Sequence, residues 1–161
     1  MSLIKLTVTD TASAALQEKK GMLEEALLAV FGELGDKLYE LVIGNLTGRV
    51  LQARTGKLAS SVELEAAAFI GAVCQTAVAI PEGSDSWLIG MVHEYGGLGW
   101  YSIDPVNAQV LAWMGPEGMV FARHVNHPPA EERSFMRSAL AWMEADAVDQ
   151  IKTTIAEVLA A

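Results

Sequence analysis

The stretch Leu23–Gly44, LEEALLAVFGELGDKLYELVIG, decides the fold of this 161-residue chain. Its apolar residues recur at steps of three and four, the period of an α-helix with one apolar face. The same period begins near Ala12 and continues to about Val50, so we predict one long helix over residues ~12–50 whose apolar stripe packs in the core or on a partner helix. Gly21 and Gly32 each cost about 1 kcal/mol relative to alanine. We expect a kink or break near one of them.

The residues on either side of this helix favour β-structure. Residues 3–9 are rich in β-branched side chains and indicate a short strand, after which Asp10 or Thr11 can cap the helix. Downstream, residues 62–71 and 72–81 alternate like two strands joined at Gly71. Cys74 lies among apolar neighbours in the second of these and is expected to be a buried strand residue.

After residue 87 the sequence predicts a short element, a β-hairpin and then a second long helix. Residues 87–95 indicate a short helix or strand, and residues 109–114 and 119–125 indicate a β-hairpin with a four-residue loop, Gly115–Gly118. After Pro128 and Pro129 the helical period resumes, which predicts a helix over residues ~131–160. Glu131 and Glu132 near its start would suit the helix dipole.

This order of elements predicts an α+β fold. The length of 161 residues fits one domain with a sizeable core. We therefore expect a single domain, residues 1–161, in which an antiparallel sheet from residues ~60–125 is packed by a long N-terminal helix and a C-terminal helix.

Composition narrows the range of partners. The net charge is −9, from 20 acidic against 11 basic residues spread along the chain, which argues against sequence-specific binding to nucleic acid. Mean hydropathy is +0.29, yet no apolar run approaches the ~18 residues of a membrane helix. The surplus apolar surface is therefore expected to meet another protein.

A single cysteine excludes an intrachain disulfide, and the N-terminus lacks the apolar core of a signal peptide, so we expect a cytoplasmic protein.

The pair His93-Glu94 raises the question of a metal hydrolase. Zinc hydrolases with a His-Glu pair need a second histidine four residues after the first, on the same helical face, and here that position is Gly97. We therefore predict no catalytic set, no metal and no cofactor. A small metal-dependent hydrolase with a loop site built from His93, Glu94, His124 and His127 stays open as the alternative.

The order and spacing of several short motifs carry a resemblance that spans residues 15–160. The pieces begin with the long helix and Arg54-Thr55-Gly56-Lys57-Leu58, and continue with His93-Glu94-Tyr95-Gly96-Gly97. Further pieces are residues 103–113, 120–123 and 133–140. In this order the chain resembles the phage virion morphogenesis and tail-completion family of Mu-like phages and prophages, which are neck proteins. It departs from the family pattern in an insert over residues 97–102 and in the stretch 126–130.

The resemblance implies a structural, non-enzymatic protein of the head–tail junction that acts in tail completion or virion assembly by protein–protein contacts. Its implied partners are other phage head, neck or tail proteins, together with further copies of itself in a homo-oligomeric ring. It would reside in the cytoplasm of the bacterial host during assembly and afterwards in the virion. Tyr95 would pack as an aromatic anchor, and the loop Gly96–Pro105 would be mobile until it docks. The residues that match the family motifs are Arg54, Thr55, Gly56, Leu58, His93, Glu94, Tyr95, Gly96, Gly97, Pro105, Trp113, Phe121, Ser134 and Phe135.

Overall fold

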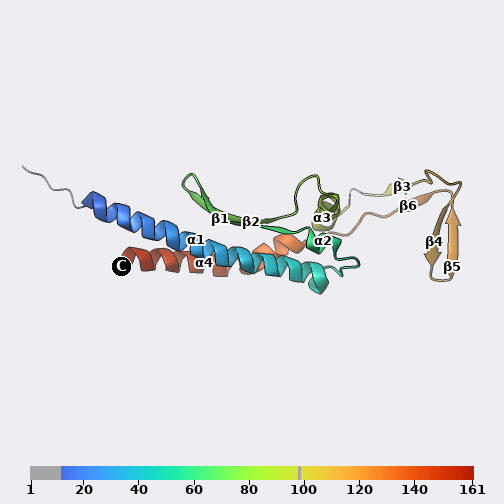
Figure 1. The fold of residues 1–161 in the computed structure, drawn as a ribbon. Coiled ribbons are helices and arrows are strands. Elements are labelled where there is room, and N and C mark those ends of the chain that lie inside the picture. Colours follow the sequence, from blue (N-terminus) through green and yellow to red (C-terminus); the bar gives the residue numbers. More distant parts are fainter. Residues whose placement is uncertain (1–11, 98) are drawn as a thin grey trace, which may run out of the picture. The chain divides into compact units, whose positions relative to one another are not determined.

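The chain is an α+β protein in which a long N-terminal helix and a C-terminal helix pack on antiparallel strands (Figure 1). The structure, a computed structural model, describes residues 12–97 and 99–161, with side chains from residue 16 onward. The predicted strand 3–9 and its capping residues lie outside the described residues. The predicted fold class is confirmed.

Two compact units make up the chain. Unit 1 contains residues up to Ile43, Val62–Ala79 and Ala139–Ala161, and unit 2 contains Gly44–Ser61 and Ile80–Ser138. Two long helices, α1 (Ala12–Gly44) and α4 (Phe135–Ala160), contribute to both.

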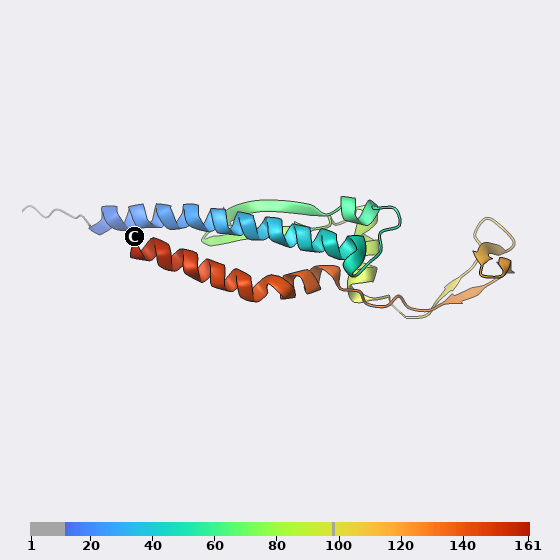
Figure 2. The ribbon, with the colours of Figure 1, turned by 90° about the horizontal axis from the view of Figure 1, so that it is seen from below.

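In unit 1, helices α1 and α4 lie antiparallel and side by side (Figures 1 and 2). Two contacts show this direction: Lys19 Nζ donates to the carbonyl oxygen of Leu159, and Lys37 Nζ pairs with Asp146 at 2.9 Å. The stripe predicted for residues ~12–50 thus packs mainly on a partner helix. The apolar core between the helices consists of Leu27, Val30, Phe31, Leu34, Leu38 and Leu41 of α1 with Met143, Ala147 and Ile151 of α4.

The helix prediction for residues ~12–50 is confirmed, but the predicted kink is wrong. Helix α1 continues through Gly21 and Gly32 because burial along its stripe outweighs the modest propensity cost of a glycine. The irregularity comes later, in the π-helical turn η1 (Asn45–Arg49), where Gly48 has a φ of 151°.

The hairpin of unit 1 is formed by β1 (Glu63–Ile70) and β2 (Val73–Ala79), as the sequence predicts. It lies against α1 at Gly35, where a Cβ atom would come within 2.5 Å of Thr76 Oγ1, so only glycine permits this approach. Cys74 pairs with Phe69 in this hairpin and is only partly buried, because a two-stranded sheet leaves one face open to solvent.

Unit 2 contains α2 (Lys57–Ser60), α3 (Asp85–Tyr95) and two further antiparallel strand pairs. The first pairs β3 (Tyr101–Ile103) with β6 (Val125–His127), and the second pairs β4 (Leu111–Gly115) with β5 (Gly118–Ala122). Within residues 12–97 and 99–161 the strands therefore form three two-stranded sheets and not one continuous sheet. The turn between β4 and β5 has two residues, Pro116 and Glu117, where the sequence predicted four.

The segment that contains β3 to β6, here called the arm (residues 99–129), makes its main contacts between its own strands. No described residue from 95 to 134 is buried. Part of the loop Gly96–Pro105, predicted to be mobile, is the paired strand β3. Backbone hydrogen bonds close the base of the arm, from Gly97 N to Ala130 O at 2.9 Å and from Arg133 N to His93 O at 2.7 Å.

Candidate functional site

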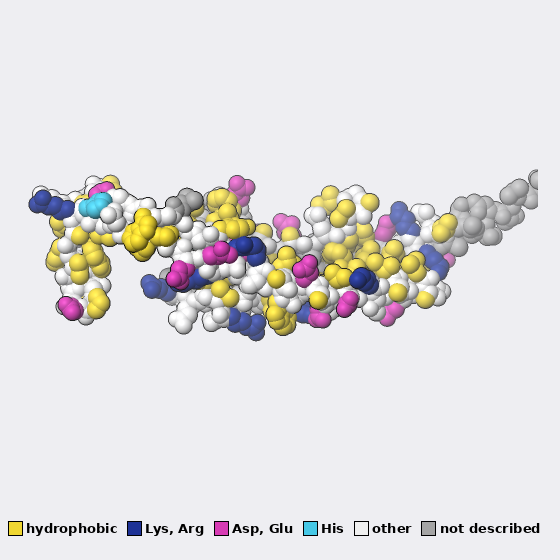
Figure 3. Space-filling model, turned by 180° about the vertical axis from the view of Figure 1, so that it is seen from behind, with side chains coloured by type: hydrophobic (Ala, Val, Ile, Leu, Met, Phe, Trp, Pro, Cys, Tyr) yellow, Lys and Arg dark blue, Asp and Glu magenta, His cyan; other side chains and the backbone are white. Residues whose placement is uncertain are grey.

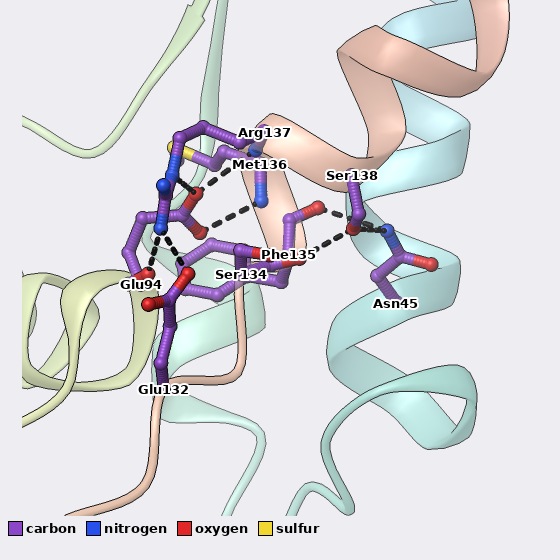
Figure 4. Close-up of polar contacts among 8 residues, drawn as sticks. All are labelled: Asn45, Glu94, Glu132, Ser134, Phe135, Met136, Arg137 and Ser138. Atoms are coloured by element: carbon purple, nitrogen blue, oxygen red, sulfur yellow. Dashed lines mark hydrogen bonds and ion pairs between the residues drawn. The ribbon is translucent and has the colours of Figure 1, made fainter.

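Three of the motif residues, Glu94, Ser134 and Phe135, come together at the start of helix α4, where Glu94 is the centre of a hydrogen-bond network (Figure 4). Glu94 lies near the end of α3 and is only 4% exposed. Its Oε2 accepts from the backbone N–H of Met136, and its Oε1 accepts from that of Arg137, both at 2.9 Å. The first turn of a helix has N–H groups without helical partners, so Glu94 caps α4 from another helix.

Arg137 completes this network. Its Nε donates to Glu94 Oε1 at 3.0 Å, and its Nη2 donates to the backbone oxygen of Glu94 and to Glu132 Oε1. The hydrogen bond to Glu94 raises the pKa of Arg137, and the bond to Glu132 adds to it. Both oxygens of the Glu94 carboxylate are thus occupied by donors, which gives this residue a structural role.

Tyr95, expected to pack as an aromatic anchor, does not pack in the core of the described chain. Its side chain is 57% exposed, and the guanidinium of Arg137 lies 4.7 Å from the centre of its ring. Because Glu94 holds Arg137 in this position, the tyrosine is covered by a cation and not by the core.

On the other side of the helix start, Asn45 ties η1 to α4. Asn45 is buried, and its Nδ2 donates to the backbone oxygen of Phe135 at 2.8 Å and to Ser138 Oγ at 3.2 Å (Figure 4). The Ser138 hydroxyl in turn donates to the backbone oxygen of Ser134. The helix predicted from residue ~131 therefore begins at Phe135, after Glu131 and Glu132, because its caps come from Glu94 and not from its own first acids.

A second group of motif residues lines a cavity of unit 2 with a volume of about 680 Å³. Its wall includes Arg54, Thr55, Gly56, Leu58 and His93, which are far apart in the sequence, together with Arg133. Partial burial, followed by the charge of Arg133, lowers the pKa of His93 below its ordinary value of 6.5. The cavity thus combines two arginines with a histidine whose neutral form is favoured.

The remaining motif residues are separate from both places. Gly96 and Gly97 lie against the chain at residues 130–132, and a Cβ on Gly97 would be 2.7 Å from Ala130 N. Trp113 and Phe121 stand on β4 and β5 of the arm and are exposed. The motif is therefore distributed over a helix cap, a cavity and an arm.

The alternative metal site does not assemble in the structure. Among the residues described, no group of three or more histidine, cysteine, aspartate or glutamate side chains is placed to hold a metal ion. His93 lies at the cavity on α3, whereas His127 belongs to β6 and stacks on Tyr101. His124 pairs with Asp104 in the arm.

Ser102, Asp104 and His124 form a cluster that the sequence did not reveal. Ser102 Oγ and Asp104 Oδ1 both lie 3.1 Å from Nδ1 of His124, and Ser102 Oγ donates to Asp104 Oδ2 at 3.0 Å. In a catalytic triad the serine and the aspartate bind opposite nitrogens of the imidazole. Here both are on the same nitrogen, so the cluster ties β3 to the chain between β5 and β6.

We expect the imidazole of His124 to titrate above 6.5. Nδ1 faces Asp104 and Nε2 faces Asn126 Oδ1 at 3.0 Å, so the protonated ring has an acceptor for both N–H groups. The hydrogen bond to Asp104, and then that to Asn126, raises the pKa of His124, and the same pair lowers the pKa of Asp104. The contribution of His124 to stability is thus full below pH 6.5 and is lost as the pH rises through its folded pKa. The contribution of Asp104 to stability is full above pH 3.8 and is lost as the pH falls through its lowered pKa.

An NMR titration of the histidine ring protons measures this pKa directly. Asp104→Asn should move the His124 midpoint down towards 6.5, while Glu117→Gln, elsewhere in the arm, should leave it unchanged. A midpoint at or below 6.5 in the unsubstituted protein contradicts the pairing.

Comparison of the chain with models of protein families, with curated proteins and with solved structures gives no match. None of the helices within the described residues is long and apolar enough to cross a membrane.

Proposed function

We propose that this chain is a structural protein of the head–tail junction of a phage or prophage, acting in tail completion or virion assembly through protein–protein contacts. It would act in the bacterial host cytoplasm during assembly and then in the virion. Its partners would be other head, neck or tail proteins and further copies of itself in a ring.

The observation that carries this proposal is the exposed apolar surface of the arm (Figure 3). An isolated pair of strands is marginally stable in water, and the arm consists of two such pairs, β3–β6 and the hairpin β4–β5. Contiguous apolar surface on a water-soluble fold is typical of a protein interface. The large apolar side chains exposed here are Trp100, Tyr101, Val106, Val110, Trp113, Met114, Met119, Val120 and Phe121.

The hydrogen bonds of Glu94 support a structural role for this residue, whose pairing with His93 in the sequence suggested a metal hydrolase. A general base must have a free lone pair directed at substrate. Both carboxylate oxygens of Glu94 accept hydrogen bonds from α4, so Glu94 holds α3 to the start of α4, while His93 lines the cavity.

The test is binding of the full chain to the head, neck and tail proteins encoded next to it. We expect the unchanged protein to retain one or more of them in a pull-down. The double variant Trp113→Ser/Phe121→Ser, which changes only exposed side chains, should lose them without a change in melting temperature. A matched control is Leu140→Ser, an exposed position on α4 outside the arm.

Two results would overturn the proposal. One is that no neighbouring head, neck or tail protein binds. The other is metal-dependent hydrolysis of ester or peptide substrates that disappears in His93→Ala and in His124→Ala, which would establish the hydrolase instead.

A further inference from the structure

The cavity of unit 2 is lined by both apolar and cationic side chains. Leu51, Leu58 and Ile89 supply apolar lining, and Arg54 and Arg133 supply positive charge. No aspartate or glutamate is part of its described lining, although the whole chain carries a net charge of −9.

Neither Arg54 nor Arg133 has a strong ionic partner within the described residues. Among the described residues, Arg54 makes no hydrogen bond or ion pair. The ion pair of Arg133 with Glu131 is 4.0 Å long, and both side chains are largely exposed, so it contributes little. The cavity of about 680 Å³ has room for several side chains but not for a folded domain. It therefore fits a narrow apolar element that carries a negative charge.

The tip of the β4–β5 hairpin is such an element. Glu117, in the two-residue turn, is the only charged residue between Leu111 and Ala122. It is exposed, and within the described part of the chain it has no hydrogen-bond or ion-pair partner. Met114 and Met119 flank the turn as an exposed cross-strand pair, and methionine side chains adapt readily to irregular apolar surfaces.

We propose that the β4–β5 tip of one copy binds in the unit 2 cavity of a second copy, with Glu117 at Arg54 and Arg133 and the two methionines against the apolar lining. This inference rests on the self-assembly included in the proposed function and names the surfaces that would make it. One patch then meets a different patch on the next copy, which is the head-to-tail geometry that builds rings or filaments.

A second copy is the occupant that the observations favour. Glu117 and Arg54, both unpaired within the described residues, and the weakly paired Arg133 are on the same chain, so every copy carries both surfaces. Their opposite charges, combined with apolar surface on both sides, give complementarity that a neutral peptide or an anionic polymer such as DNA would satisfy only in part.

Charge reversal tests the pairing. Self-association of the full chain is measured by sedimentation or light scattering over a concentration series. We expect Glu117→Arg and Arg54→Glu each to weaken it by about thirtyfold or more, because each places like charges against one another in the interface. The double variant Glu117→Arg/Arg54→Glu should recover most of the affinity, and so should an equimolar mixture of the two single variants. Glu82→Arg, the same charge change at an exposed site of unit 2, should have little effect.

The outcomes separate this inference from the proposed function. Self-association that survives Glu117→Arg, or loss that the double variant does not restore, overturns the docking of tip in cavity. A protein that is monomeric at all concentrations also overturns it. None of these results affects the test of the proposed function, which depends only on whether head, neck or tail proteins bind in the pull-down.

Discussion

Glu94→Ala should lower the free energy of unfolding by about 3 kcal/mol. The substitution removes a buried carboxylate that accepts from two backbone N–H groups and from the Arg137 side chain. Hydrogen bonds to a charged group are worth about 1.5–3 kcal/mol, and breaking a buried ion pair costs about 3–5 kcal/mol. The lower end applies because the Arg137 side chain is half exposed and can return to water. Urea denaturation measures the difference.

Glu132→Ala is the matched control. It removes the second carboxylate partner of Arg137, at 2.7 Å, but that carboxylate is exposed, so the cost should be below about 1 kcal/mol. Glu94→Gln keeps one acceptor oxygen and should fall between the two. Equal stability of Glu94→Ala and the unchanged protein would show that the cap does not hold α4.

Phe135→Ala should cost about 3–5 kcal/mol, the largest effect we expect. The Phe135 side chain is 0% exposed, and its ring approaches Gly90 of α3. Truncation removes the burial of the ring and leaves a cavity that the two helices can fill only in part. Thermal unfolding, followed by circular dichroism, provides the measurement.

Leu140→Ala is the control on the same helix. Leu140 is 55% exposed, so its truncation should change stability by no more than about 0.5 kcal/mol. Both residues lie on α4, but only Phe135 is buried. Similar losses in the two variants would contradict the burial seen in the structure.

The long helices were predictable because their signal is local. Apolar residues three and four apart identify α1 and α4 without knowledge of their partners. The hairpins β1–β2 and β4–β5 were found for the same reason, through alternation and turn residues. Strands β3 and β6 were missed, since three residues each are too short to show a period.

The site depends on contacts that no local pattern records. Glu94 binds N–H groups 42 and 43 residues away, and the cavity joins Arg54 to His93 and Arg133. The sequence holds one signal for the buried acid, which is that Glu94 follows the apolar run Trp87–Val92. A charge next to such a run needs a partner, and Arg137 is the partner that the fold provides.

Because backbone hydrogen bonds close the base of the arm, the stability of the rest of unit 2 should depend little on the length of the arm. The chain leaves after Tyr95 and returns before Ser134 through two backbone hydrogen bonds, and no described side chain between these points is buried. Loop-closure entropy grows only with the logarithm of length, so doubling the segment would cost about 0.6 kcal/mol. The arm is therefore a natural position for insertions: a reporter domain placed within it, or an arm of different length and sequence, should leave the capped helices intact.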